Sequence, residues 1–214
     1  MSVAAAAFST ECRRCARLAS FLDESKRRYP DHACRPVPSF GEAQPRLLVV
    51  GLAPGLHGAN RTGRPFTGDH AGLLLYQTLF DAGFASGAVS VSAADALTLH
   101  QARITNAVRC VPPANKPTPA EIHECNGYLA AEITALKSLR VIVALGRIAH
   151  DAVLDALAIR RGARRFAHAA EHALPGGAML LDSYHCSRYN TQTRRLTPAM
   201  FAAVFARARE LVDA

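Results

Sequence analysis

The sequence lacks the features that place a protein in or across a membrane. Its 214 residues contain no apolar run of about 18 residues or more, the length that a membrane-spanning helix needs. The opening segment MSVAAAAFST has none of the basic residues that begin a secretory signal peptide. We therefore expect a cytoplasmic or nucleoid-associated protein with no membrane partner.

Signatures of several common catalysts are missing as well. The chain has no G-x-x-x-x-G-K-S/T phosphate loop and no G-x-G-x-x-G turn, which disfavours binding of a nucleoside triphosphate or a dinucleotide. Clusters of Asp and Glu that would bind catalytic metal ions are also absent, which weakens the case for a nucleotide-processing hydrolase. The only lysines are Lys26, Lys116 and Lys137, so an amine nucleophile has few candidates.

Basic residues are in excess. The 25 Lys and Arg residues against 17 Asp and Glu give a formal net charge of +8. Such a charge favours partners rich in phosphate, because cationic side chains attract a polyanion and release its counterions. The alternative is an arginine-rich surface that is merely solvated, and composition alone leaves both interpretations open.

Short apolar runs alternate with amphipathic stretches along the chain. The first run, RLLVVGLAP, ends in Gly and Pro as a buried parallel strand does. Asp69 is suited to cap the helix that follows, and a proline-rich segment precedes the helix that begins near Ala120. We expect strands at residues 46–54, 103–110, 140–146 and 178–185, and helices at 69–83, 120–137, 147–158 and 197–212. This alternation predicts a single α/β domain over residues 1–214, with a mainly parallel sheet covered on both faces.

Four of the six cysteines are spaced as metal ligands. Cys12 and Cys15 form a C-x2-C pair, and Cys110 and Cys125 follow far along the chain. Without an export signal a disulfide framework is disfavoured. Four thiolates suit zinc or an iron-sulfur cluster, which spacing does not separate, and unligated cysteines remain an alternative. Such a site would tie the N-terminal arm to the domain and, having no open coordination position, would be architectural.

Three polar segments follow predicted strands. The first is the Gly-rich stretch GLAPGLHGANRTGRPFTGD at residues 51–69, whose polar tips include His57 and Arg61; the others are Thr105-Asn106 and the segment around His185. Because the carboxyl ends of parallel strands meet at one edge of a sheet, we expect these segments to form one site. Cys34 and Cys186 lie outside the metal set and are expected to be small buried side chains.

These segments resemble the uracil-DNA glycosylase superfamily, and within it family 5, the iron-sulfur type. The resemblance rests on the Gly-rich stretch, the strand tip at Asn106, the four cysteines and SYHCSRYNTQTRRLT at residues 183–197. It implies a three-layer α/β/α fold with a central four-stranded parallel sheet. It also implies a 4Fe-4S cluster and hydrolysis of the N-glycosidic bond of uracil, and of other deaminated or modified bases, in DNA.

The resemblance assigns base-binding roles to the strand ends. Phe66 corresponds to an aromatic that stacks on the extruded base, although a core phenylalanine is the plainer reading. Asn106 corresponds to an amide that pairs with a pyrimidine edge. His185 corresponds to a histidine that contacts a base oxygen, against the alternative of a structural histidine. The backbone amides of Gly51, Leu52 and Ala53 are further donors.

Water positioning is expected to differ from that in other branches of the superfamily. Ala53 stands where those branches have a polar or acidic side chain. Asn60 aligns with an acidic position of a related branch and is expected to orient water. Asp69 is expected to stabilise the sugar cation, and a plain helix cap is the competing interpretation. No lysine lies in the three motifs, which predicts a monofunctional enzyme that leaves an abasic site.

DNA contacts are expected from the segment after His185. Candidates for the side chain that fills the vacated base stack are Arg188, Tyr189 and Leu196. Cys186 replaces the family's usual proline and Arg194 its usual glycine. The basic loop at residues 160–165 either grips the DNA backbone or is solvated.

The main rival to a glycosylase is a non-catalytic, metal-stabilised nucleic-acid-binding module. It accounts for the charge and the cysteines, but not for Phe66, Asn106 and His185 at three strand ends of one sheet. We expect a monomer that acts on DNA containing uracil or other damaged bases.

Overall fold

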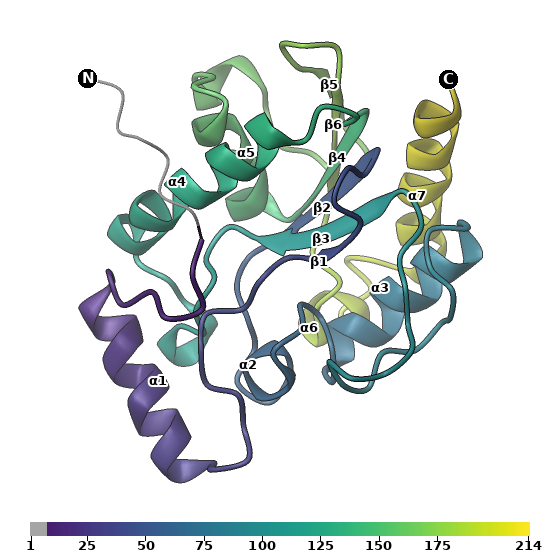
Figure 1. The fold of residues 1–214 in the computed structure, drawn as a ribbon. Coiled ribbons are helices and arrows are strands. Elements are labelled where there is room, and N and C mark those ends of the chain that lie inside the picture. Colours follow the sequence, from purple (N-terminus) through teal and green to yellow (C-terminus); the bar gives the residue numbers. More distant parts are fainter. Residues whose placement is uncertain (1–7) are drawn as a thin grey trace.

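The computed structural model describes residues 8–214 and is built around one six-stranded sheet (Figure 1). In spatial order the strands are β1-β3-β2-β4-β6-β5. Their bounds are β1 Phe40–Gly41, β2 Leu47–Gly51, β3 Ala102–Asn106, β4 Val141–Leu145, β5 Glu171–Ala173 and β6 Met179–Ser183. The helices are α1 Ala16–Arg28, α2 Ala59–Thr62, α3 His70–Asp81, α4 Pro119–Ala135, α5 Arg147–Ala156, α6 Arg188–Gln192 and α7 Pro198–Asp213, with short 3-10 turns at Pro113–Asn115 and Arg161–Ala163.

The four inner strands are parallel, as predicted. Strand β2 pairs with β3 on one side and β4 on the other, and β4 pairs with β6. The two edge strands are antiparallel to their neighbours and were not predicted. At two and three residues they are too short to produce a recognisable alternation of apolar and polar side chains.

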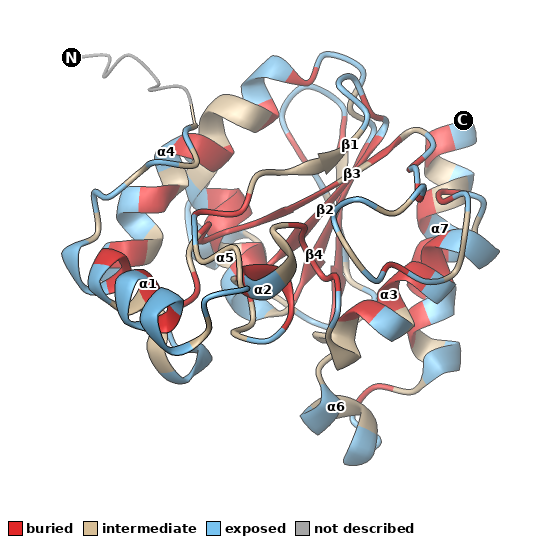
Figure 2. Cartoon of the chain, turned by 60° about the horizontal axis from the view of Figure 1, so that its bottom comes forward, coloured by how far each residue is buried: buried red, intermediate tan, exposed pale blue. Residues whose placement is uncertain are grey.

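Helices cover both faces of the sheet, which gives the three-layer α/β/α arrangement. Because side chains alternate along a strand, Leu47 and Val49 of β2 face one layer, and Leu48 and Val50 face the other. The first layer is made by α3 and α7, and the second by α4 and α5. Figure 2 shows the resulting pattern, with buried strands between helices whose outer faces are exposed. No helix of residues 8–214 has the length and apolarity needed to cross a bilayer.

Side-chain caps set where α3 and α4 begin. The Asp69 carboxylate accepts a hydrogen bond from the Gly72 amide at 2.9 Å and so caps α3. Thr118 and Glu121 form a reciprocal capping box around Pro119 at the start of α4. The observed starts of α3 and α4 agree closely with those expected from the sequence. The first two strands are shorter than expected, ending at Gly51 and Asn106, because the chain leaves the sheet there to form the loops of the site.

Helix α1 lies against the second layer rather than on the sheet (Figure 1). Leu18 packs with Val108 and Tyr128, beside the segment after β3 and the middle of α4. The Arg17 guanidinium forms two 2.7 Å hydrogen bonds with the Glu121 carboxylate. These contacts bring the N-terminal cysteines close to the later pair.

Candidate active site

A cleft of about 520 Å³ opens at the carboxyl ends of β2, β3 and β6. This volume lies within the range of small-molecule pockets. The three polar segments singled out in the sequence therefore meet at one edge of the sheet. The cleft is lined by Leu52, Ala53, Gly55, Leu56, His57, Gly58, Ala59, Phe66, Asp69, His70, Ala71, Asn106, Asn115, His185, Ser187 and Arg188.

Two aromatic rings are nearly parallel in this cleft. The Phe66 and His185 rings have centroids 6.0 Å apart and planes inclined by 28°. Phe66 is 7% exposed and packs with the first layer, so it is both a core residue and part of the cleft. Its φ of 54° lies in the left-handed region, a strained backbone of the kind that recurs at functional sites.

Gly51 allows Phe66 and Asn106 to approach the end of β2. A Cβ at this position would lie 2.4 Å from the Asn106 Oδ1 atom and 2.5 Å from the Phe66 ring. Both distances are shorter than any real contact, so only glycine fits. From the sequence, Gly51 is expected to contribute a backbone amide as a donor. The structure shows a second reason for glycine, because two neighbouring side chains pack closely against it.

The Asn106 side chain lines the cleft and is 3% exposed. Its Oδ1 atom has no hydrogen-bond partner among the described residues. An orphaned buried acceptor costs about 1–3 kcal/mol, and a ligand that donates to it recovers that energy. The carboxamide therefore has the chemistry to pair with a polar ring edge.

His185 follows β6 at the rim of the sheet and is half-buried. Its carbonyl accepts a 2.8 Å hydrogen bond from the Asn190 side chain, which fixes the loop. Burial lowers the pKa of His185 below its ordinary value, and the Asp69 carboxylate opposes that shift. The imidazole is therefore neutral at neutral pH and offers one N–H donor.

The two oxygens of Asp69 have different surroundings. Oδ1 caps α3, as the plainer interpretation predicted. Oδ2 faces the Gly-rich loop, where a Cβ on Gly58 would lie only 2.3 Å from it and one on Gly55 would lie at 3.4 Å. Asp69 also lines the cleft, so a cap and a carboxylate at the site are compatible.

Asn60 lies elsewhere than expected. It is fully buried beneath the loop, and it is not among the described residues that line the cleft. Its Nδ2 atom donates weak hydrogen bonds to the Cys34 Sγ at 3.5 Å and the Leu56 carbonyl at 3.4 Å. Its Oδ1 atom is buried and has no hydrogen-bond partner among the described residues. The side chain supports the loop from below, and the expectation that Asn60 orients water stays a prediction. Cys34 is half-exposed rather than buried.

Of the three candidates for DNA contact after His185, two are exposed and one is buried. Tyr189 is 70% exposed, and Arg188 is exposed beside the cleft. Leu196 is 0% exposed and packs in the first-layer core, so its expected role as a DNA-contacting side chain is wrong. The chain turns back after α6, where the Leu196 amide bonds the Asn190 carbonyl at 3.0 Å. The prediction for Cys186 is confirmed, since it is fully buried.

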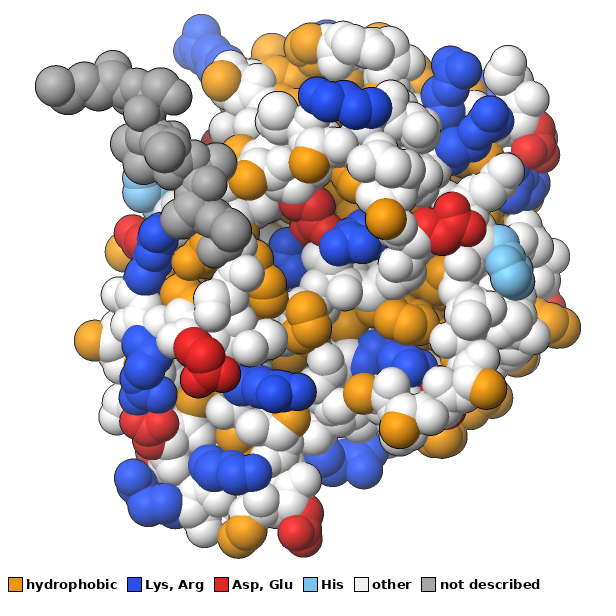
Figure 3. All heavy atoms as spheres, viewed as in Figure 1, with side chains coloured by type: hydrophobic (Ala, Val, Ile, Leu, Met, Phe, Trp, Pro, Cys, Tyr) orange, Lys and Arg blue, Asp and Glu red, His pale blue; other side chains and the backbone are white. Residues whose placement is uncertain are grey.

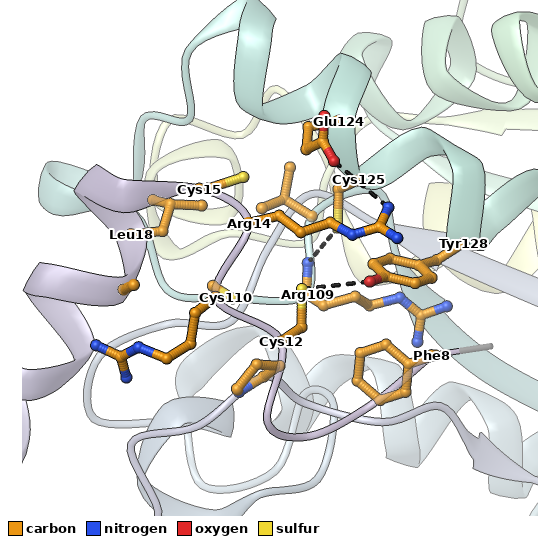
Figure 4. Close-up of a pocket in the computed structure, with 14 residues that line it drawn as sticks. Phe8, Cys12, Arg14, Cys15, Leu18, Arg109, Cys110, Glu124, Cys125 and Tyr128 are labelled. Carbon is orange, nitrogen blue, oxygen red and sulfur yellow. Dashed lines mark hydrogen bonds and ion pairs between the residues drawn. The ribbon is translucent and has the colours of Figure 1, made fainter. Parts of the chain in front are cut away.

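Four thiols gather around one small cavity, with Phe8, Leu18 and Tyr128 among its other walls (Figure 4). They belong to Cys12, Cys15, Cys110 and Cys125, and all are free of disulfides. The Tyr128 hydroxyl donates to the Cys12 sulfur and the Arg109 amide to the Cys125 sulfur, both at 3.3 Å.

The spacing of these sulfurs suits a cluster better than a single ion. Within residues 8–214, no three of them lie within 4.8 Å of one another. A tetrahedral zinc site with Zn–S bonds near 2.3 Å needs sulfurs about 3.8 Å apart, whereas a multinuclear core holds its ligands wider. Burial, and repulsion from the neighbouring thiolates, raise the pKa of Cys15 to about 11 and that of Cys110 to about 12. A cationic core would remove that repulsion and hold the sulfurs as thiolates.

Two buried networks of polar side chains were not predicted from the sequence. Asp182 of β6 accepts from His150 of α5 at 2.7 Å and from His172 of β5 at 3.1 Å. The other ring nitrogen of His150 lies 3.1 Å from the Arg164 carbonyl, which ties the basic loop to the sheet. Arg64 forms a buried ion pair with Asp95 and does not point into the cleft. The side-chain partners of Asp182 and Arg64 lie more than 20 residues away or on a short edge strand. Patterns of neighbouring residues in the sequence therefore do not indicate them.

Comparison with known proteins agrees with this geometry. The family model described as the uracil DNA glycosylase superfamily matches residues 38–209. A type-5 uracil-DNA glycosylase of Thermus thermophilus is 48% identical over 207 residues, which cover 94% of each chain. That of Mycobacterium bovis is 46% identical, covering 94% of this chain and 78% of the relative. That of Pyrobaculum aerophilum is 42% identical, covering 92% and 87%. The chain thus belongs to the uracil-DNA glycosylase superfamily and, within it, to the type-5 family.

Proposed function

We propose that this protein is a monofunctional DNA glycosylase of base excision repair that removes uracil, and other deaminated or modified bases, from DNA. It acts as a monomer on chromosomal DNA in the cytoplasm. One observation carries the proposal: an aromatic ring, a neutral imidazole and a buried amide whose oxygen has no partner within residues 8–214 converge on one cleft from three strand ends.

The cleft suits a nucleotide that has left the helix. A base inside a duplex is out of reach, so the enzyme must extrude it, and a lesion that pairs weakly costs less to extrude. The extruded ring stacks on Phe66, while the Asn106 amide pairs with its Watson-Crick edge. Tyr189 is exposed and suited to fill the vacated stack, with Arg188 beside the cleft to contact phosphate.

Cleavage of the N-glycosidic bond separates charge. The bonding electron pair leaves with the base, which becomes an anion, and the deoxyribose becomes a cation. The His185 N–H donates to a base oxygen and stabilises the anion, helped by the amides of Gly51, Leu52 and Ala53. The Asp69 carboxylate stabilises the sugar cation. Water then bonds to the sugar carbon, and the proton that it loses passes by way of solvent to the base anion, which leaves an abasic site and the free base.

The lysines argue against strand cleavage. All three, Lys26, Lys116 and Lys137, lie within the described residues, and none lines the cleft. Cutting the backbone through a Schiff base needs an amine at the sugar carbon. The reaction therefore ends at the abasic site, and borohydride should trap no covalent adduct between the protein and DNA.

A 4Fe-4S cluster is the group that the four cysteines fit. Cys12, Cys15, Cys110 and Cys125 would hold it, with sulfur spacing too wide for one zinc ion. With no open coordination position, the cluster supplies cross-linking rather than chemistry on the base. It would tie the N-terminal arm to α4 and to the segment after β3. Brown protein with iron supports this assignment, and colourless protein with zinc alone contradicts it.

The activity is tested with a single-stranded oligonucleotide that carries one uracil. Wild-type protein should leave the strand intact until alkali cleaves it at the abasic site. His185→Gln should fold normally and lose most of that product, because the imidazole that stabilises the anion is gone. Binding without any alkali-sensitive site would instead favour the non-catalytic module.

A further inference from the structure

A second hollow, of about 460 Å³, lies beside the cleft and is unused by the proposed chemistry. It is bordered by Arg28, Tyr29, Pro30, Asp31, His32 and Arg61. Arg61 comes from α2, in the Gly-rich loop, and the others come from the end of α1 and the turn after it. Figure 1 shows α2 near the lower end of α1, although the two are far apart in the sequence.

Three rings form a compact aromatic group at this place, which we call the histidine platform: Tyr29, His32 and His57. The Tyr29 and His32 rings are stacked, with centroids 4.7 Å apart and planes inclined by 13°. The exposed His57 ring stands at 84° to Tyr29 and 87° to His32. The His32 Nδ1 atom is buried and has no partner among the described residues. Such rings offer stacking surface for a nucleobase of any sequence.

The platform is held in place before any ligand arrives. The Lys26 ammonium donates to the Pro30 carbonyl at 2.8 Å and to the His32 carbonyl at 2.6 Å. The next residues bond to the backbone of α2, with the Cys34 amide 3.0 Å from the Asn60 carbonyl. A surface that is already ordered binds with less loss of conformational entropy.

His57 connects the platform to the cleft. It lines the cleft, while its ring contacts the Tyr29 and His32 rings. The Arg61 Nε atom donates to the His57 carbonyl at 2.8 Å, so the two residues form one wall. Arg28, whose guanidinium lies 5.4 Å from the Tyr29 ring, adds a second cation, against the single carboxylate of Asp31.

We propose that the histidine platform, with Arg28 and Arg61, binds an unpaired nucleotide of the DNA strand next to the one held in the cleft. The base stacks on the rings, and its phosphate contacts the arginines. The aromatic faces accept a base only outside the double helix, so this site favours single-stranded or locally opened DNA. The inference extends the proposed function, because it supposes that the neighbouring cleft holds DNA.

The test is the binding of a uracil-free, dye-labelled thymidine oligonucleotide of about 12 nucleotides, followed by fluorescence anisotropy. Tyr29→Leu should weaken binding by about fivefold or more, while Tyr29→Phe, which keeps the ring, should bind as wild type does. Thermal unfolding and the visible spectrum check that each variant is folded. No base is excised in this experiment, so its result is independent of the proposed glycosylase activity.

A matched pair of arginine variants tests the phosphate contact separately. Arg28→Gln should flatten the slope of log affinity against log salt by about 0.7, as expected for one lost contact to a single strand. Arg27→Gln removes the same charge from the neighbouring residue, which does not border the hollow, and should leave the slope unchanged. Equal slopes for the two variants, or wild-type affinity for folded Tyr29→Leu, would overturn the inference.

Discussion

Replacing Gly51 by alanine tests how closely the site is packed. A Cβ would lie 2.4 Å from the Asn106 Oδ1 and 2.5 Å from the Phe66 ring, whereas ordinary contact begins at 3.4 Å. One or both side chains must therefore move by about 1 Å, and a displacement of that size can slow an enzyme by about 10²-fold. Overpacking of this kind also lowers the free energy of unfolding by about 1–3 kcal/mol.

Single-turnover excision of uracil, measured alongside urea unfolding, gives both quantities for Gly51→Ala. The control is Gly127→Ala on α4, where an added Cβ meets nothing within 4 Å. That variant should excise uracil normally and gain about 0.5–1 kcal/mol of stability, because alanine suits a helix better than glycine. A folded Gly51→Ala protein with wild-type rate would refute the idea that the positions of Phe66 and Asn106 control excision.

Four further predictions each concern one side chain. Asn106→Leu should cut the rate of excision by about 10²-fold. The free energy of unfolding should stay the same or increase, because the buried oxygen without a partner is gone. A lower free energy of unfolding with a normal excision rate would contradict this. Leu196→Ala should lower unfolding free energy by about 2–5 kcal/mol while the folded protein keeps its DNA affinity. Arg194→Gly should raise the melting temperature, because Arg194 has a φ of 56° in the left-handed region. Burial lowers the pKa of His150, but the hydrogen bond to Asp182 and the charge of that carboxylate outweigh burial. The net effect raises the pKa of His150 above its ordinary value of 6.5. The stability from that pair is therefore full below about pH 6.5 and is lost as the pH rises through the raised pKa. In His150→Gln the free energy of unfolding should depend less on pH over this range.

Much of the fold follows from local patterns. The inner strands are continuous apolar runs, and the starts of α3 and α4 carry the caps Asp69 and Thr118, which act only over a few residues. The convergence of the three polar segments follows from the rule that parallel strands end at one edge. What local patterns do not contain is the path of the chain after a strand ends.

The differences between the expected and the observed site have that cause. Leu196 and Tyr189 both follow His185, and only the reversal after α6 decides that one is buried and the other exposed. Asn60 lies in the right motif, but the short helix α2 turns its side chain under the loop. The histidine platform joins residues from two distant segments, so neither segment alone predicts it.

A crystal structure with free uracil bound would test the central claim most directly. The account predicts the uracil ring stacked on Phe66, with its polar edge within hydrogen-bond distance of the Asn106 amide and one ring oxygen facing the His185 imidazole. Uracil bound away from these three side chains would contradict it.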